Sequence, residues 1–214
     1  MFTSFMKDAV EFGRYRIKSP LGKGGMAEVL LATQVGPSDF VKPCVLKRIH
    51  PEHLENAALR KMFEQEARIS ALLNHPNVVQ TFDYGEIDDI PFMAMELVEG
   101  LSLSAMNLKM VQLNCWWDLR SAIEIALAIG RALAYAHALC SPEGEELRLV
   151  HRDVSPQNVL VSFDGEVKVV DFGIAKNALR AHETEAGIIK GKFYYMSPEQ
   201  ARGEVLDHRT DIFS

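Results

Sequence analysis

The stretch VHRDVSPQNVLVSFDGEVKVVDFG, residues 150–173, contains two runs in which apolar and polar residues alternate. The runs are Val159–Phe163 and Glu166–Val170, and the pair Asp164-Gly165 separates them. An Asp-Gly pair between two strand-like runs is typical of a tight β-hairpin. We therefore predict two antiparallel strands joined by a two-residue turn.

This hairpin would bring together side chains that carry oxygen ligands. If Asp164 and Gly165 form the whole turn, Asn158 lies directly opposite Asp171, at roughly 5 Å. The carboxylate of Asp153 lies a short way upstream of Asn158. Amide and carboxylate oxygens are hard ligands that suit magnesium bound to phosphates. The stretch thus predicts a site for metal-assisted phosphate chemistry.

The same residues carry a family resemblance. His151–Asp153 (HRD) followed by Asn158 resembles the catalytic loop of a eukaryotic-type protein kinase, and Asp171–Gly173 (DFG) resembles its metal-binding motif. The alternative is that Asp153 and Asp171 are ordinary turn-forming acids at strand ends, but two motifs at this spacing favour the kinase. The resemblance implies that Asp153 accepts the substrate proton and that Asn158 and Asp171 hold Mg²⁺.

A glycine-rich segment, residues 22–29 (GKGGMAEV), lies between predicted strands at 15–21 and 29–33. Glycines let backbone N–H groups approach a phosphate without obstruction by side chains, although a plain hairpin would look similar. A dinucleotide-binding fold would require a helix directly after the glycines, but here a predicted strand follows them. The segment resembles the kinase glycine-rich loop, with Ala27 in the place of the third glycine.

Lys47 lies on a predicted buried strand, residues 44–47. Residues 56–74 have helical spacing of apolar side chains, and Glu66 falls in the middle of the apolar face. A carboxylate there is costly unless a cation pairs with it. We predict that Lys47 is that cation, the alternative being a partly solvated Glu66. The kinase resemblance implies the same pair, and it makes Lys47 and Glu66 catalytic together with Asp153.

The segment 93–100 (MAMELVEG) resembles the kinase strand and hinge that hold adenine, with Met95 as gatekeeper. The backbone of Glu96 and Val98 would then bind the adenine edge, although both methionines could equally be core residues. In full, the resemblance implies these ATP-binding residues: Leu21, Gly22, Lys23, Gly24, Gly25, Met26, Ala27, Glu28, Val29, Val45, Lys47, Met95, Glu96, Val98 and Leu160.

The region after Gly173 resembles a kinase activation segment that ends at residues 196–199 (MSPE), and Thr184 is the implied activating phosphorylation site. The motifs HRDVSPQN, GGMAEV and MSPEQARG most resemble bacterial serine/threonine kinases. One departure concerns Ser155, which stands where such kinases have a lysine that contacts the γ-phosphate. Serine supplies a hydrogen bond but no charge.

Composition excludes several other classes. A net charge of −6 argues against nucleic acid or an anionic membrane as the main partner. Three cysteines without C-x-x-C spacing predict free thiols in a reducing cytoplasm. The most apolar stretch, residues 119–140, is interrupted by Arg120, Glu124 and Arg131, which favours a buried helix over a membrane span. Residues 1–16 lack the apolar run that is typical of a signal peptide.

These observations predict an α+β protein with the protein-kinase fold. Residues 1–12 would be a flank, residues 13–98 a small β-rich N-lobe, and residues 99–214 a mainly helical C-lobe that is incomplete after Ser214. The implied activity is ATP- and Mg²⁺-dependent phosphorylation of protein serine or threonine in the cytoplasm, with any membrane anchor beyond Ser214. The alternative is a non-catalytic nucleotide-binding or scaffolding kinase fragment.

Overall fold

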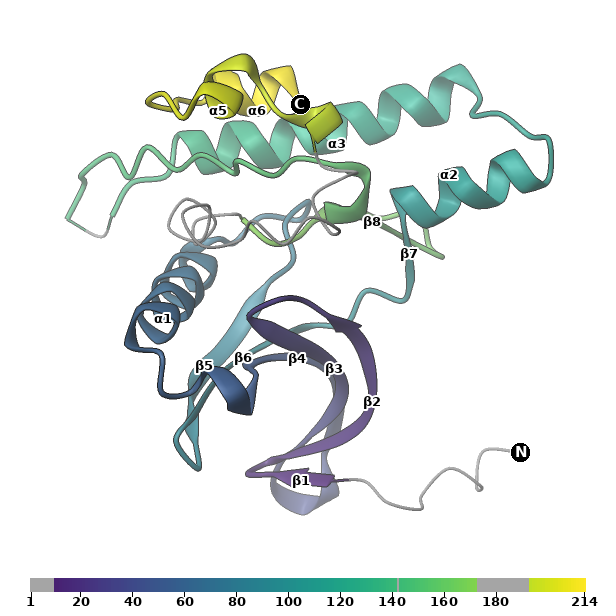
Figure 1. Ribbon diagram of the computed structural model, residues 1–214. Coiled ribbons are helices and arrows are strands. Elements are labelled where there is room, and N and C mark those ends of the chain that lie inside the picture. Colours follow the sequence, from purple (N-terminus) through teal and green to yellow (C-terminus); the bar gives the residue numbers. More distant parts are fainter. Residues whose placement is uncertain (1–9, 142, 173–192) are drawn as a thin grey trace. The chain divides into compact units, whose positions relative to one another are not determined.

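The computed structural model describes residues 10–141, 143–172 and 193–214 (Figure 1). Within it the chain forms two compact units. The β-rich unit comprises Met1–Leu72 and Gln80–Leu97, and the helical unit comprises Leu73–Val79 and Val98–Ser214. The first crossover between them, at residues 73–79, means that a short segment of the predicted N-lobe belongs to the helical unit.

A six-stranded antiparallel sheet forms the body of the β-rich unit, with strand order β1-β2-β3-β4-β6-β5. Its strands are β1 (Val10–Phe12), β2 (Tyr15–Lys23), β3 (Ala27–Val35), β4 (Val41–Ile49), β5 (Thr81–Ile87) and β6 (Ile90–Glu96). Helix α1 (Ala57–Leu72) and the short 3-10 turns η1 (Pro37–Asp39) and η2 (Pro51–His53) complete the unit. Residues 10–12 were expected in a flank, but they pair with β2 and extend the sheet by one strand.

Alternation along β4 assigns its side chains to two different clusters. Cys44 and Leu46 pack with Tyr15 and Phe92 in one cluster, whereas Ile49 packs with Phe63 of α1 in the other. Successive residues of a strand point to opposite faces, so α1 covers the face that carries Ile49. Burial raises the pKa of the Cys44 thiol, as expected for a packing residue. All three cysteines are free, as predicted.

The helical unit contains the long helix α3 (Leu119–His137), the shorter helices α2 (Leu103–Gln112), α5 (Pro198–Arg202) and α6 (Arg209–Phe213), and the 3-10 turns η3 (Pro156–Asn158) and η5 (Phe193–Tyr195). Strands β7 (Gly100–Ser102), β8 (Val159–Ser162) and β9 (Val167–Val169) form a small antiparallel sheet. Helix α3 is capped by Asp118, whose side chain accepts from Ser121 N–H. Its apolar face packs Ile125 and Ala128 against Val159 and Val167 of the small sheet.

The β8–β9 hairpin is present, but its predicted register is wrong by one residue. Val159 pairs with Val169 and Val161 with Val167, and the Ser162 N–H donates to the Glu166 carbonyl. The loop therefore has three residues, with Gly165 last at a φ of 89°, a left-handed conformation that favours glycine. As a consequence Asn158 lies opposite Val170, not Asp171, and its carbonyl accepts from Val170 N–H at 3.0 Å.

In the portion of the chain that the structure describes, no helix is both long enough and apolar enough to cross a membrane. Residues 119–140, the most apolar stretch, instead form α3 and the turn after it. Its buried side chains are Ile125, Ala128, Ala132, Leu133 and Ala136.

Candidate active site

The predicted site residues fall into two groups, one in each unit. In the β-rich unit, Lys47 of β4 and Glu66 of α1 form the predicted ion pair, with Nζ and Oε1 2.5 Å apart. Their side chains are 12% and 7% exposed, so the pair is largely shielded from water and solvent screens it little. Glu66 shares its helix face with the buried Leu59, Met62 and Phe63. At this position the ion pair with Lys47, and not water, compensates the charge of its carboxylate.

The β3–β4–β6 ladder arranges the other predicted nucleotide contacts around Lys47. Val29 of β3 is the cross-strand partner of Lys47. On the other side of β4, Met93 pairs with Lys47 and Met95 pairs with Val45. Directly opposed residues share a face of the sheet, so Val29, Val45 and Met95 project on the same side as Lys47. The ladder thus builds an apolar surface around one cation.

The glycine-rich loop connects β2 to β3. The Gly24 N–H donates to the Ala27 carbonyl at 2.9 Å, which closes the loop. The Ala27 side chain is buried against Ile49 and Phe63, which explains how alanine fits where a third glycine was expected. Leu21, Gly22 and Gly25 are exposed, and Met26 is half-buried. Glu28, another predicted ATP contact, is engaged by Arg48 at 2.7 Å.

At the end of β6, the Glu96 N–H donates to the Gln80 carbonyl at 3.0 Å. Gln80 N–H in turn donates to the Glu96 carboxylate at 2.9 Å. These two bonds hold Glu96 firmly at the end of the strand. Val98 begins the helical unit, and Leu160 lies half-buried on β8 of that unit.

In the helical unit, His151 organises the loop that carries Asp153. Its ring is fully buried and lies 4.5 Å, between centroids, from the ring of Phe172. Its Nδ1 accepts from Asp153 N–H at 3.2 Å, and its Nε2 lies 3.0 Å from the Val170 carbonyl. A carbonyl only accepts, so Nε2 carries the hydrogen and the ring is neutral. One histidine therefore fixes both ends of the site, Asp153 and the Asp171-Phe172 segment.

Asn158 fixes the orientation of the Asp153 side chain. Its Nδ2 donates to the Asp153 Oδ2 at 2.7 Å and to the Asp153 carbonyl at 2.8 Å. Because both bonds use the amide nitrogen, the Oδ1 of Asn158 points away from Asp153. Asn158 itself is buried at the end of η3. This arrangement holds the Asp153 carboxylate and leaves the Asn158 Oδ1 directed away from it.

The backbone of this loop departs from regular structure at two residues, Arg152 and Asp171, whose φ values are 67° and 54°. Such left-handed conformations are costly for residues other than glycine and persist only where surrounding contacts enforce them. Asp171 is exposed while the neighbouring Phe172 is 3% exposed. The buried phenyl ring thus anchors the segment that displays the Asp171 carboxylate.

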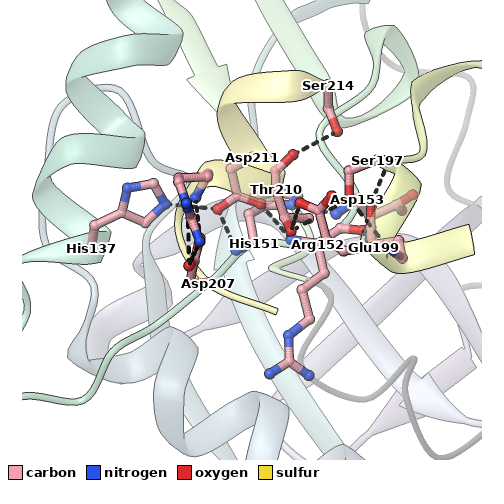
Figure 2. Close-up of polar contacts among 12 residues, drawn as sticks. His137, His151, Arg152, Asp153, Ser197, Glu199, Asp207, Thr210, Asp211 and Ser214 are labelled. Carbon is pink, nitrogen blue, oxygen red and sulfur yellow. Dashed lines mark hydrogen bonds and ion pairs between the residues drawn. The ribbon is translucent and has the colours of Figure 1, made fainter. Parts of the chain in front are cut away.

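Asp211 of α6 supplies those enforcing contacts for Arg152 (Figure 2). Its fully buried carboxylate accepts from the backbone N–H of His151 at 2.8 Å and of Arg152 at 2.7 Å. It also lies 2.7 Å from the Nε2 of His137 on α3. One carboxylate therefore ties α3, α6 and the loop together, a role that sequence analysis did not assign to Asp211.

A second tie runs through α5. Ser197 caps this helix through a reciprocal capping box with Gln200. The Gln200 Nε2 donates to the Arg152 carbonyl at 2.8 Å, so both the N–H and the carbonyl of Arg152 are bonded. Thr210 of α6 donates to the Glu199 carboxylate at 2.8 Å, which links α5 to α6 (Figure 2).

The side chains at this site fit a magnesium ion. Asn158 and Asp171 offer an amide oxygen and a carboxylate, the hard ligands that magnesium takes in small number while keeping several waters. Among the described residues there is no cluster of three or more His, Cys, Asp or Glu side chains that could hold a metal.

Comparison with known proteins identifies the arrangement. The protein kinase domain family matches residues 15–214. The chain belongs to this family. It is 38% identical over 203 residues to a protein named tyrosine-protein kinase MasK of Myxococcus xanthus, a match that covers 95% of this chain and 31% of that protein. It is 34% identical over 202 residues to serine/threonine-protein kinase PrkC of Bacillus subtilis, covering 94% of this chain and 29% of PrkC.

Solved structures agree with the family assignment. The kinase domain of PknI from Mycobacterium tuberculosis superposes with a TM-score of 0.67 at 27% identity. That match covers 96% of this chain and 72% of the PknI chain. The chain spans less than a third of the length of MasK and PrkC.

One residue of the kinase domain departs from the expected pattern, as the sequence indicated. Ser155 is 4% exposed and directly precedes η3. Within the described residues its Oγ has no hydrogen-bond partner. The loop therefore carries a short neutral side chain where a lysine was expected. Thr184, the predicted phosphorylation site, lies outside the described residues.

Proposed function

We propose that this kinase domain transfers the γ-phosphoryl group of ATP to serine or threonine hydroxyls of protein substrates. The single observation that carries the proposal is the Asp153 carboxylate held by Asn158 Nδ2 at 2.7 Å. A carboxylate held in this way can orient an acceptor hydroxyl and take its proton as the phosphoryl group transfers. The relatives named serine/threonine kinases support the choice of acceptor.

The remaining residues would position the nucleotide. Lys47, held by Glu66, would contact the α- and β-phosphates, and Asn158 with Asp171 would hold Mg²⁺. When bound, Mg²⁺ neutralises charge on the phosphates. The apolar face formed by Val29, Val45 and Met95 would pack against the adenine ring, which excludes water from one side of the base.

A second candidate is transfer to tyrosine. The relative named tyrosine-protein kinase is 38% identical to this chain. The short side chain of Ser155 would also leave more space beside Asp153 than a lysine would. A non-catalytic, nucleotide-binding role is the third reading, and it predicts ATP binding without turnover.

A phosphorylation assay separates these readings. The chain would be incubated with radiolabelled ATP, Mg²⁺ and a generic basic protein, and the labelled amino acids would then be identified by hydrolysis. Phosphoserine and phosphothreonine support the proposal, phosphotyrosine supports the second candidate, and ATP binding without label supports the third.

Two carboxylate variants test the assigned roles in the same assay. Asp153→Asn should abolish turnover and leave ATP affinity nearly unchanged, because Asp153 acts on the acceptor. Asp171→Asn should weaken Mg²⁺-dependent ATP binding. Asp164→Asn, at an exposed carboxylate of the β8–β9 loop, is the matched control and should behave as wild type. Equal loss of ATP binding in Asp153→Asn and Asp171→Asn would contradict these roles.

A further inference from the structure

Two histidines contact the backbone of the glycine-rich loop. The His50 Nε2 lies 3.1 Å from the Gly24 carbonyl oxygen, and the His53 Nε2 lies 3.0 Å from the Gly25 carbonyl oxygen. His50 directly follows β4 and His53 ends η2, so both belong to the same short segment. The backbone N–H of His50 also donates to the Met26 carbonyl, at 3.2 Å. Three consecutive carbonyls of the loop are therefore held by one segment.

The protonation of the two rings follows from their partners. A carbonyl oxygen only accepts hydrogen bonds, so each Nε2 must carry a hydrogen. His50 is 5% exposed, which favours a fixed ring position. The His53 side chain is 32% exposed, and its Nε2 also lies 3.9 Å from the Glu52 carboxylate. The segment therefore presents two N–H donors side by side to the loop.

Peptide geometry determines where the backbone N–H groups of the loop point. The described residues contain no cis peptide bond, and in a trans peptide the N–H points opposite to the carbonyl of the preceding residue. When the Gly24 and Gly25 carbonyls point to the histidines, the N–H groups of Gly25 and Met26 point away from them. Within the described residues neither N–H has a hydrogen-bond partner. Successive backbone N–H groups of this kind bind anions.

We propose that His50 and His53 are positioning residues that orient the Gly25 and Met26 amides toward the phosphates of the nucleotide. The inference rests on the proposed function, because it needs ATP as the ligand of the loop. A flexible glycine-rich loop loses conformational entropy on binding, and a loop that is already held in place binds more tightly. The histidines therefore raise affinity for the phosphates without touching them.

Calorimetric titration of the 214-residue chain with Mg·ATP and, separately, with adenosine tests the proposal. Adenosine lacks phosphates, so it reports on the adenine surface alone. His50→Phe and His53→Phe keep an aromatic ring but remove the donor. Each should weaken Mg·ATP binding about twofold to tenfold, as the loss of one hydrogen bond does, and leave adenosine affinity unchanged. His50→Gln and His53→Gln, which keep an N–H donor at similar reach, should restore most of the ATP affinity.

His208→Phe, at an exposed histidine before α6, is the control and should leave both affinities unchanged. Unchanged ATP affinity in both loop variants, or equal weakening of ATP and adenosine in folded variants, would overturn the inference. If His50→Phe does not fold, as circular dichroism would show, the more exposed His53 variants decide the question. A wild-type chain that binds adenosine but not Mg·ATP would instead overturn the proposed function.

Discussion

The two units position their functional side chains by different physical means. In the β-rich unit, Lys47 and Glu66 lie on a regular strand and a regular helix, and alternation and helical phase alone bring them to 2.5 Å. In the helical unit, Asp153 lies on an irregular loop between Arg152, with a φ of 67°, and η3. Polar contacts from distant residues hold that loop.

This difference teaches where each unit is vulnerable. Backbone hydrogen bonds of a ladder and a helix are many, so the loss of one side-chain contact changes the local geometry little. The loop has few backbone bonds of its own and depends on single side chains such as Asp211 and His151. We therefore expect the largest effects from substitutions of the polar residues in the helical unit.

Asp211→Ala should have the largest effect. It leaves the N–H groups of His151 and Arg152 without their acceptor, at about 1–3 kcal/mol each when such groups are buried. We expect the free energy of unfolding, measured in urea, to fall by about 2–6 kcal/mol, and phosphoryl transfer to be lost.

The matched control is Asp207→Ala, four positions earlier. The Asp207 carboxylate is bound by the Arg209 guanidinium, which lowers the pKa of Asp207 to about 2, but the contact is exposed to solvent. Exposed ion pairs contribute little. If both substitutions changed stability equally, Asp211 would not be the anchor of the loop.

Gly100→Ala should have the next largest effect. A Cβ at Gly100 would lie 2.0 Å from the Val161 carbonyl oxygen of β8, which is far inside van der Waals contact. Separation of β7 from β8 should cost about 1–3 kcal/mol of stability, as overpacking does. Gly130→Ala, in α3 where a Cβ meets nothing within 4 Å, should instead stabilise by roughly 0.5–1 kcal/mol. Thermal unfolding of both variants distinguishes a steric effect from a general effect of alanine.

A double-mutant cycle examines the pair of the β-rich unit. Lys47→Met and Glu66→Gln, alone and together, should show coupling on the order of 1 kcal/mol or more in ATP affinity. The control cycle uses Arg60 and Glu86, which also join α1 to a strand, at 2.7 Å, but are more exposed. Additive effects at Lys47 and Glu66 would mean that their contact does not support nucleotide binding.

The sequence predicted contacts between regular elements of the β-rich unit better than contacts to the irregular loop of the helical unit. Glu66 was predicted correctly to face Lys47 because helical periodicity is a local property of the chain. The role of Asp211 could not be predicted, because the backbone groups that it binds are 59 and 60 positions earlier. No local pattern reports such a contact.

One local prediction failed, and one helix was left unpredicted. The β8–β9 register is shifted because Phe163 joins Asp164 and Gly165 in the loop, and the Asp-Gly pair alone does not distinguish loops of two and three residues. Helix α2 was not predicted because it has no buried residue. Its apolar residues Leu108 and Val111 are exposed, and Leu103 packs only partly buried against the cluster that contains Ile125 and Val159.

The smallest effect is expected at a polar contact of the β-rich unit. The Tyr15 hydroxyl donates to the Asp83 carboxylate, which Arg14 also binds. Burial and this hydrogen bond raise the pKa of the Tyr15 phenol above its ordinary value. In the unfolded chain the phenol ionises near pH 10, whereas in the folded chain it stays protonated to higher pH. Its contribution to stability is therefore complete below about pH 10 and is lost as the pH rises further.

Tyr15→Phe should lower the free energy of unfolding at pH 7 by about 1 kcal/mol, because the ring packing on Phe92 remains. Above pH 10 the wild-type protein should lose stability faster than the variant, so that the two unfolding curves approach each other. Tyr84→Phe, at an exposed tyrosine of β5 in the same sheet, should run parallel to wild type. If Tyr15→Phe also ran parallel, the phenol would not be coupled to folding. A loss much larger than that for Asp211→Ala would reverse the contrast between the two units.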